Sequence, residues 1–410
     1  MIEFLEVDNL ETAVDKLYRE CAKTDFATSQ EEVLLLNSLD RILSEDLISE
    51  VEVPNFNRST VDGYAVVAND TNAASDTVPV ILNVVGSVEM GMEYKGRVNS
   101  SECVYVPTGG MIPDGAGAVV MIEDTEQISE NKIVVYKSIG EGKNIVVSGD
   151  DVKKEDLILH KGKKITPYDI GLLSSVGIEK FKVYNKLNVT IISTGDELIS
   201  DREKLSKGKV LDINSNLLES MVIENGLNVT GKYLLQDNEK DLENAIKNSI
   251  GSSDIILISG GSSKGKKDLT SFVIDKVSSS GVLTHGIAIQ PGKPTITSFD
   301  EKSKTMIIGL PGHPIASAIL FRLVVLKVID KIRKVSHRER TCTGILTENI
   351  PASQGRATIQ LVNIDDNFNI IPLFGKSGLI HRMSKSDGYI LIDRNKEGYN
   401  KGEKVKVYYL

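Results

Sequence analysis

The stretch LNVTIISTGDEL, residues 187–198, decides the fold class of this chain of 410 residues. It joins an apolar, β-branched run typical of a buried strand to a polar loop that contains a glycine. The same alternation continues from Leu187 to about Lys334, and it predicts a parallel sheet with helices on both faces. The strand-like runs are Val189–Ile192, Val229–Leu235, Ile255–Ile258 and Met306–Ile308, and the helix-like runs are Leu217–Glu224, Leu242–Ile250 and Ile315–Ile332.

Three polar loops follow strands of this predicted sheet: STGDEL at residues 193–198, SGGSSKG at residues 259–265 and GLPGHP at residues 309–314. In open α/β sheets, ligands bind beyond the carboxyl ends of the strands, so we expect the three loops to face one crevice. Glycine lets the backbone approach a phosphate closely, and hydroxyl and amide groups donate hydrogen bonds to it. The loops therefore predict a phosphorylated ligand.

Acidic residues stand in the same loops, at Asp196, Glu197 and Asp268. They would repel a phosphate unless a divalent cation lay between, and oxygen ligands combined with phosphate indicate Mg²⁺. A simpler interpretation is that Asp196 and Glu197 cap the helix that they precede.

A P-loop ATPase is a further alternative, because residues 260–266 have the spacing G-x-x-x-x-G-K. The next residue, however, is Lys267, where a P-loop has the Ser or Thr that holds Mg²⁺. We interpret the segment as a glycine loop that faces a phosphate. Its lysines, Lys264, Lys266 and Lys267, either flank that phosphate or form a solvated rim.

Outside the α/β region, the pattern predicts helices and small β domains. A capped helix is expected from Asp8, a second helical stretch from Glu31 to Leu47, and a third helix from Thr166 to a stop at Gly177. Between about Val78 and Lys137, short apolar runs alternate with turns, which predicts a β domain inserted between helical segments. After His337 the short β runs return, and they predict a terminal β domain.

Composition and charge exclude several classes of protein. A net charge of -9 argues against broad attraction to nucleic acid or to anionic lipid. The longest apolar stretches fall short of the roughly 18 residues of a membrane span. The opening MIEFLEVDNLE lacks a signal-peptide pattern. Since Cys21, Cys103 and Cys342 lie far apart, neither a zinc site nor a disulfide framework is indicated, and we expect a cytoplasmic protein.

Several shorter motifs have a structural interpretation of their own. Asp62-Gly63, within NRSTVDGYAV at residues 57–66, is typical of a hairpin turn, although Arg58, Ser59 and Thr60 add polar groups that a turn does not require. PTGG at residues 107–110 is typical of a loop between two strands. In QPGKP, residues 290–294, two prolines hold Lys293 on a stiff loop. His313 is interpreted as a hydrogen-bonded scaffold residue.

Taken together, these motifs resemble the molybdenum insertase family (MoeA type, molybdopterin molybdenumtransferase) in order and spacing across nearly the whole chain. The resemblance implies a multidomain fold of mixed α/β and β parts. Its expected domains are a discontinuous helical dimerisation domain at residues 1–50 and 142–184, an inserted β domain at 51–141, a molybdopterin-binding α/β domain at 185–335 and a C-terminal β barrel at 336–410.

The resemblance also implies an activity. The chain would insert molybdate into adenylylated molybdopterin with Mg²⁺-dependent release of AMP, and would act as a homodimer whose cleft the second subunit completes. Molybdopterin adenylyltransferase and apo-molybdoenzymes or their chaperones are the further expected partners. Neither nucleic acid nor a membrane is expected as a partner.

The family's functional positions, carried over one by one, divide into three expected roles. The catalytic residues are Asp62, Thr108, Glu197, Asp237 and Asp268, and Glu197 and Asp268 would also hold Mg²⁺. The substrate-binding residues are Asp151, Thr194, Gly195, Ser259, Gly260, Gly261, Ser262, Lys264, Pro291, Lys293, Pro294, Pro311 and Gly312.

Four positions, Ser262, Lys264, Gln290 and His313, depart from the usual family pattern. They leave open whether molybdate or tungstate is the preferred substrate. Two alternative functions also remain. The first is molybdopterin adenylyltransferase, because the α/β domain also resembles those enzymes, which consist essentially of that domain alone. The second is a non-catalytic scaffold or paralogue, as in eukaryotic relatives of the module.

Overall fold

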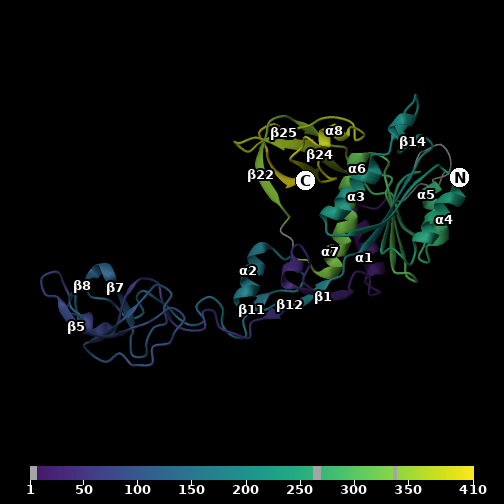
Figure 1. The fold of residues 1–410 in the computed structure, drawn as a ribbon. Helices are drawn as coiled ribbons and strands as arrows, with labels where there is room; N and C mark the ends of the chain where they lie inside the picture. Colours follow the sequence, from purple (N-terminus) through teal and green to yellow (C-terminus); the bar gives the residue numbers. More distant parts are fainter. Residues whose placement is uncertain (1–6, 262–268, 336–338) are drawn as a thin grey trace. The chain divides into compact units, whose positions relative to one another are not determined.

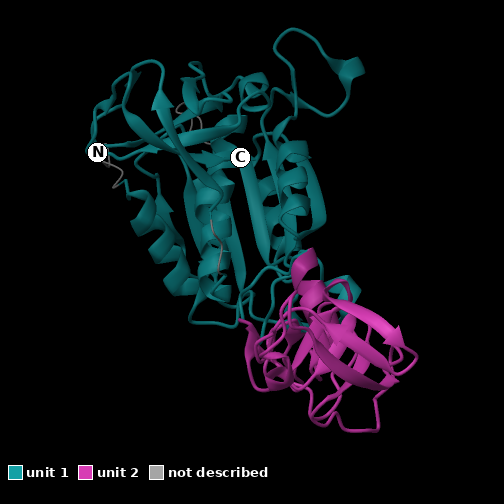
Figure 2. Ribbon diagram, turned by 90° about the vertical axis from the view of Figure 1, so that its left-hand side faces the viewer, with its two compact units in different colours: residues 1–45, 161–166, 181–410 teal, residues 46–160, 167–180 magenta. Residues whose placement is uncertain are grey.

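The computed structural model describes residues 7–261, 269–335 and 339–410, and it divides into two compact units. Unit 1 comprises residues 1–45, 161–166 and 181–410, and unit 2 comprises residues 46–160 and 167–180 (Figure 2). Each unit is therefore assembled from segments that are distant in the sequence. The four domain boundaries predicted from the sequence divide the chain more finely and stay a prediction.

A sheet forms the centre of the α/β part of unit 1 (Figure 1). It has six strands in the order β16-β13-β17-β21-β20-β18. The first four strands in this order run parallel, whereas β20 and β18 are antiparallel to their neighbours. The predicted parallel sheet is confirmed for those four strands, and two antiparallel strands that the sequence did not predict extend it. The bounds are β13 Asn188–Thr194, β16 Asn228–Leu235, β17 Ile255–Gly260, β18 Val282–His285, β20 Ile296–Asp300 and β21 Thr305–Leu310.

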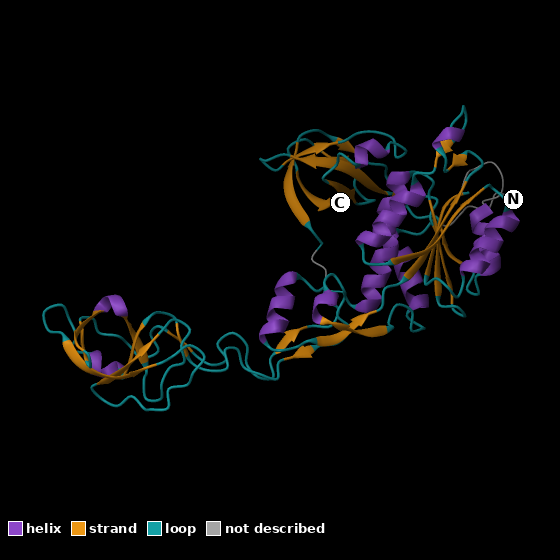
Figure 3. Cartoon of the chain, viewed as in Figure 1, coloured by secondary structure: helices purple, strands orange, loops and turns teal. Residues whose placement is uncertain are grey.

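Helices cover both faces of this sheet (Figure 3). Ile191 and Leu257 pack with α1, α3 and α6 on one face, whereas Ile192 and Ile258 pack with α4 and α5 on the other. Successive side chains of a strand point to opposite faces, so a strand buried on both faces is apolar throughout. The bounds are α1 Leu10–Cys21, α3 Asn214–Glu224, α4 Glu239–Ser249, α5 Leu269–Val277, α6 Pro314–Leu320, the π-helix η5 Phe321–Leu326 and α7 Lys327–Arg333.

The N-cap of the first helix, α1, lies one residue later than predicted. Asn9 is the N-cap, and its side chain accepts a hydrogen bond of 2.7 Å from the backbone N–H of Thr12. Asp8 has other partners instead, because its carboxylate accepts hydrogen bonds of 2.7 Å from Lys16 and from Thr284. The N-terminal helix is thus bound to strand β18 of the sheet.

The prediction of a helix from Glu31 to Leu47 is wrong. This segment contains β1 Gln30–Leu34, the 3₁₀ helix η1 Leu35–Ser38 and the beginning of β2 Leu47–Ile48. β1 pairs with β12, Lys180–Tyr184, and this pairing overrides the helical propensity of the segment. The helix predicted from Thr166 is confirmed as α2, Pro167–Ser175, and Gly177 follows it with a φ of 76°.

The C-terminal part of unit 1 is a closed five-stranded barrel. Its strands pair in the ring β24-β25-β22-β28-β26, which a pairing between β24 and β26 closes, and β19 adds to β24 from outside the ring. Val362, Ile390 and Val407 lie in its apolar core. The predicted terminal β domain is confirmed. The bounds are β19 Ile289–Gln290, β22 Thr341–Leu346, β23 Ile350–Pro351, β24 Ala357–Ile364, β25 Asn369–Pro372, α8 Ile380–Met383, β26 Gly388–Ile392, β27 Gly398–Tyr399 and β28 Lys404–Tyr409.

Unit 2 contains the predicted small β domain. Its sheet has the order β7-β4-β6-β5-β9-β8, and β4 presents Tyr64 and Ala65 to two different apolar clusters. The apolar runs predicted as strands are found as β5, β6, β7 and β9. The bounds are β3 Arg58–Ser59, β4 Gly63–Val66, η2 Ala68–Thr71, β5 Val80–Ser87, β6 Glu102–Val106, β7 Ala118–Met121, η3 Ile122–Asp124, β8 Thr125–Ser129, β9 Lys132–Val135, β10 Ile145–Val146 and β11 Leu157–Leu159.

Candidate functional site

Three polar loops meet at the carboxyl edge of the unit 1 sheet. β13, β17 and β21 are adjacent and parallel, so the segments that follow Thr194, Gly260 and Leu310 leave the sheet at the same edge. The strand order confirms that the three loops share one edge, and hydrogen bonds of Asn214, the first residue of α3, connect two of them directly.

Asn214 joins two of the loops. Its Nδ2 donates a hydrogen bond of 2.5 Å to Oγ of Ser259 and one of 2.8 Å to the backbone carbonyl of Gly312. Because the carbonyl of Gly312 can only accept, these bonds fix the orientation of the amide. Asn214 is 8% exposed, and its Oδ1 is buried without a hydrogen-bond partner.

The start of α3 is tied to β13 by a second polar group. Oγ of Ser193 donates a hydrogen bond of 3.1 Å to the carboxylate of Asp212, which also accepts one of 3.1 Å from the backbone N–H of Ser215. The sequence analysis missed Asp212 and Asn214. The signal that could have found them is the run of capping residues, DINS at 212–215, directly before a helix-like segment.

The glycines of the second loop are required by their conformation. Gly260 has a φ of 107°, and a Cβ on it would lie 2.1 Å from the backbone oxygen of Thr194. Gly261 has a φ of 69°, and a Cβ there would lie 2.5 Å from Oγ1 of Thr270. Both positions therefore exclude other residues, and they bring bare backbone to the edge of the sheet.

Exposed acids surround the first loop. The hydroxyl of Thr194 donates a hydrogen bond of 2.7 Å to the carboxylate of Asp237, and the backbone N–H of Asp237 donates one of 3.1 Å to the carboxylate of Asp196. The carboxylate of Glu197 folds back over Gly195, where an added Cβ would lie 2.9 Å from Oε2. These residues offer oxygen donors at the edge where the loops meet.

Asp196 and Glu197 do not cap a helix, so that interpretation is wrong. The strand β14, Leu198–Ile199, follows them directly and pairs in parallel with β15, Val210–Leu211. Between these strands lies the 3₁₀ helix η4, Arg202–Lys204, and α3 begins only at Asn214. The two acids are consequently free of helix-capping duty.

The loop that holds Lys293 also lies in unit 1. The backbone carbonyl of Lys293 accepts hydrogen bonds of 2.9 Å from the N–H groups of Ile287 and Thr295, while its side chain is exposed. Gly292 has a φ of 131° and closely contacts Leu320, since an added Cβ would lie 2.6 Å from Cδ1 of that residue. These contacts fix the backbone of the loop on both sides of Lys293, and the stiffness expected from Pro291 and Pro294 stays a prediction.

The third loop is anchored by its own contacts. Pro311 is buried, Gly312 is exposed, and Nδ1 of His313 lies 2.8 Å from Oγ of Ser377. This contact is compatible with the scaffold role predicted for the histidine.

Part of the predicted site lies outside the described residues. Ser262, Lys264 and Asp268 fall in the segment 262–268, so the structure does not test their predicted roles. Within residues 7–261, 269–335 and 339–410, no group of three or more His, Cys, Asp or Glu side chains is arranged to hold a metal ion. The magnesium ligands therefore stay a prediction.

A separate polar cluster lies in unit 2. The carboxylate of Asp62 accepts a hydrogen bond of 2.8 Å from the backbone N–H of Thr108, and the backbone carbonyl of Ser59 accepts one of 2.8 Å from Gly109. Asp62 and Thr108 are exposed, so their polar groups are accessible. The structure thus brings together two of the predicted catalytic residues.

Asp62 and Gly63 do not form the predicted hairpin turn. β3 before them pairs with β10, whereas β4 after them pairs with β6 and β7. The bend at this point changes sheets rather than reversing the chain. Asp151, also in unit 2, is exposed, and its backbone N–H donates a hydrogen bond of 3.0 Å to the carbonyl of Val53.

Three family models match the chain in succession. Residues 8–177 match the MoeA N-terminal region (domain I and II), residues 190–331 a "molybdopterin binding domain", and residues 343–410 the MoeA C-terminal region (domain IV). A molybdopterin biosynthesis protein of Methanocaldococcus jannaschii is 37% identical over 387 residues, which are 92% of this chain and 92% of that protein. The chain belongs to the MoeA family.

Other MoeA relatives agree over the same length. The molybdopterin molybdenumtransferase of Haemophilus influenzae is 31% identical over 93% of this chain and 94% of its own. The crystal structure of a molybdopterin biosynthesis MoeA protein from Pyrococcus horikoshii OT3 superposes with a TM-score of 0.86 at 29% identity, and it covers 99% of this chain and 100% of that one. The resemblance drawn from the sequence motifs is therefore confirmed.

The helices of this MoeA protein are short or polar. Among the residues that the structure describes, none of them is both long and apolar enough to cross a membrane.

Proposed function

We propose that this protein is a molybdopterin molybdenumtransferase, an enzyme that inserts molybdenum into molybdopterin. Relatives with that name match it from end to end, and all three parts of the MoeA architecture are present. The observation that carries the proposal within the structure is the meeting of three loops at one sheet edge. There, exposed acids lie beside glycines that no other residue can replace.

The substrates in this proposal are molybdate and adenylylated molybdopterin, and AMP is the released product. The bare backbone at Gly260 and Gly261 would admit the phosphate groups closely. Asn214 joins the buried hydroxyl of Ser259 to the carbonyl of Gly312, so the two loops are fixed relative to each other where Gly312 is exposed to the ligand.

Magnesium belongs to the proposal as a cofactor. The described acids at this edge supply oxygen donors only, and Mg²⁺ is usually bound by one or two carboxylates together with substrate phosphates. Glu197, with Asp268, would hold the ion. When bound, Mg²⁺ would act as a Lewis acid on the phosphoanhydride of the substrate. Glu197 and Asp237 would otherwise repel the phosphates, so their exposure at the edge is explained by a cation between them.

We also propose that the protein is a homodimer. In unit 1, the segment of β1 and η1 exposes three large apolar side chains: Leu34 is 61%, Leu36 is 79% and Leu39 is 45% exposed. In unit 2, Tyr168 on α2 is 89% exposed. Large apolar side chains exposed on each unit indicate contacts with another protein. A second copy of the chain would cover them, and each copy would contribute Asp62 and Thr108 to a site.

AMP release tests the proposed reaction. Purified protein is incubated with adenylylated molybdopterin, with and without Mg²⁺ and molybdate, and the nucleotide is quantified by chromatography. We expect release only when both ions are present. Formation of adenylylated molybdopterin from ATP would instead assign the adenylyltransferase activity, and neither reaction would assign the scaffold role.

A further inference from the structure

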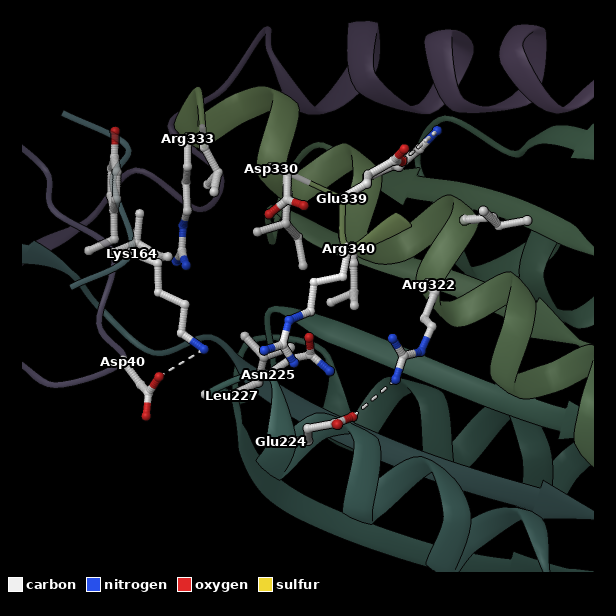
Figure 4. Close-up of a pocket in the computed structure, with 18 of the residues that line it drawn as sticks. Asp40, Lys164, Glu224, Asn225, Leu227, Arg322, Asp330, Arg333, Glu339 and Arg340 are labelled. Atoms are coloured by element: carbon white, nitrogen blue, oxygen red, sulfur yellow. Dashed lines mark hydrogen bonds and ion pairs between the residues drawn. The ribbon is translucent and has the colours of Figure 1, made fainter. Parts of the chain in front are cut away.

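A cavity of about 380 Å³ lies in unit 1, away from the three loops (Figure 4). Asn185 and Lys186 in its lining precede β13, and Asn225 and Leu227 precede β16. The cavity therefore opens at the amino edge of the parallel strands, opposite the carboxyl edge that the proposed function uses. Its volume lies in the range of pockets that bind small molecules.

Positive charge predominates in this cavity. Seven Lys or Arg and four Asp or Glu line it, although the whole chain carries a net charge of -9. Some of these charges pair, for example Lys164 with Asp40 at 2.9 Å and Arg322 with Glu224 at 3.3 Å. Figure 4 shows Lys164, Arg333 and Arg340 directed toward the same space. The lining side chains carry more positive than negative charge, which favours an anion as the ligand of this cavity.

Arg333, at the end of α7, is buried in the wall of this cavity and is held there by hydrogen bonds. It is 5% exposed, and its Nε and Nη2 donate hydrogen bonds of 2.9 and 2.8 Å to the backbone carbonyls of Ala27 and Asn185. Both acceptors are neutral. Burial lowers the pKa of the guanidinium to about 10, so it stays charged at neutral pH. A buried cation whose hydrogen bonds go to neutral carbonyls is stabilised further when an anion binds beside it.

Arg322 supplies an unused donor. Its Nη2 bonds to Glu224, but its Nε is buried without a hydrogen-bond partner. Buried donors are almost always paired in folded proteins, so the guanidinium of Arg322 has hydrogen-bonding capacity that the protein does not use. Guanidinium groups match the oxygen geometry of phosphate with two parallel hydrogen bonds.

The lining also has room for an organic group. Tyr389 and Tyr408 stack with ring centroids 5.4 Å apart and contribute aromatic surface to the cavity. Tyr389 is 6% exposed, and burial raises the pKa of its hydroxyl to about 12, so the hydroxyl keeps its proton at neutral pH. A ligand of this cavity therefore meets cations at one part and aromatic rings at another.

We propose that this cavity binds a small phosphate-bearing molecule, whose phosphate contacts the guanidinium of Arg322. The site is separate from the molybdopterin site and does not depend on the transferase reaction.

Isothermal titration calorimetry of the full chain with AMP and, separately, with inorganic phosphate tests this site. Two variants, Arg322→Gln and Glu224→Gln, break the same ion pair but change the charge of the cavity in opposite directions. We expect Arg322→Gln to weaken binding about tenfold or more and Glu224→Gln to tighten it. If the ion pair were purely structural, both variants would change the affinity for the probe in the same direction.

The pair Lys164→Gln and Asp40→Asn gives the same opposed test if the first pair fails to fold. Binding of AMP alone that Arg322→Gln weakens would identify an ester as the ligand of this cavity. Equal binding of both probes that Arg322→Gln weakens would identify the free ion. Absence of binding by both probes, or binding that none of the four variants changes, would overturn the proposal.

Discussion

Replacement of Asn214 by alanine should lower turnover strongly while it lowers the free energy of unfolding only slightly. The change removes two hydrogen bonds, to Ser259 at 2.5 Å and to Gly312 at 2.8 Å, each with a net contribution of about 1 kcal/mol. It also removes the unpaired Oδ1, whose burial costs about 1 kcal/mol, so about half of that loss is offset. We expect the free energy of unfolding to fall by about 1 kcal/mol, and Tm by roughly 2–4 °C.

Turnover should fall more steeply, because the two loops lose the group that fixes them relative to each other. A displacement of about 1 Å in a catalytic constellation can lower a rate by about a hundredfold. Molybdenum insertion and thermal unfolding are measured on the same preparations. The matched control is Asn9→Ala, which removes the N-cap bond to Thr12 in α1, costs about 1 kcal/mol as well, and should leave turnover unchanged. Equal turnover in Asn214→Ala and Asn9→Ala would refute the reasoning.

Three further predictions concern other parts of the molecule. Asp62→Ala and Glu197→Ala should each block metal insertion while the dissociation constant for molybdopterin changes little; wild-type turnover would remove both residues from the mechanism. Glu243→Gln should lower Tm at pH 7 but not at pH 2, because hydrogen bonds from two lysines lower the pKa of this carboxyl from 4.5 to about 2. The stabilisation by the ionised carboxyl is present above pH 4.5 and is lost as the pH falls toward 2. A constant difference in Tm between the variant and the wild type across this range would contradict the assignment. Leu36→Asp should convert the proposed dimer to a monomer in light scattering, whereas Ile223→Asp, at a residue that is 63% exposed on α3, should not; dimers in both variants would place the interface elsewhere.

The α/β part could be predicted because its strands are buried on both faces. Runs such as Ile255–Ile258 are continuously apolar, and each is followed by a glycine or a polar loop. Strands β18 and β20 lack this signal, since Thr284, Thr297 and Ser298 are buried polar residues within them. The buried hydroxyl of Ser298 forms hydrogen bonds with Ser278 and with the carbonyl of Gly281. These partners lie far from Ser298 in the sequence, so no local pattern predicts them.

The segment after Glu31 shows how tertiary pairing overrides local preference. Its residues Glu31, Glu32 and Leu34–Leu36 are good helix formers, but the backbone of β1 pairs with β12, about 150 residues later in the chain. The hairpin expected at Asp62-Gly63 fails for a related reason, because the partners of β4 come from β6 and β7 rather than from the preceding strand.

The candidate site could be predicted in part. The three loops were found from glycines and from their position after strands, and the contact of Asp62 with Thr108 agrees with the motifs that contain them. Asn214 and Asp212 were missed because their motif has the form of an ordinary helix cap. Their role depends on contacts with Ser193, Ser259 and Gly312, and these contacts exist only once the sheet has formed.

The most direct test of the account is the transfer of molybdenum itself. Purified protein is supplied with adenylylated molybdopterin, molybdate and Mg²⁺, and the product is used to activate a cofactor-free molybdoenzyme. The account predicts that activity is restored and that it disappears when molybdate, Mg²⁺ or the protein is omitted. Restoration that is equal without the protein, or no restoration with all components present, would contradict the assignment as a molybdenumtransferase.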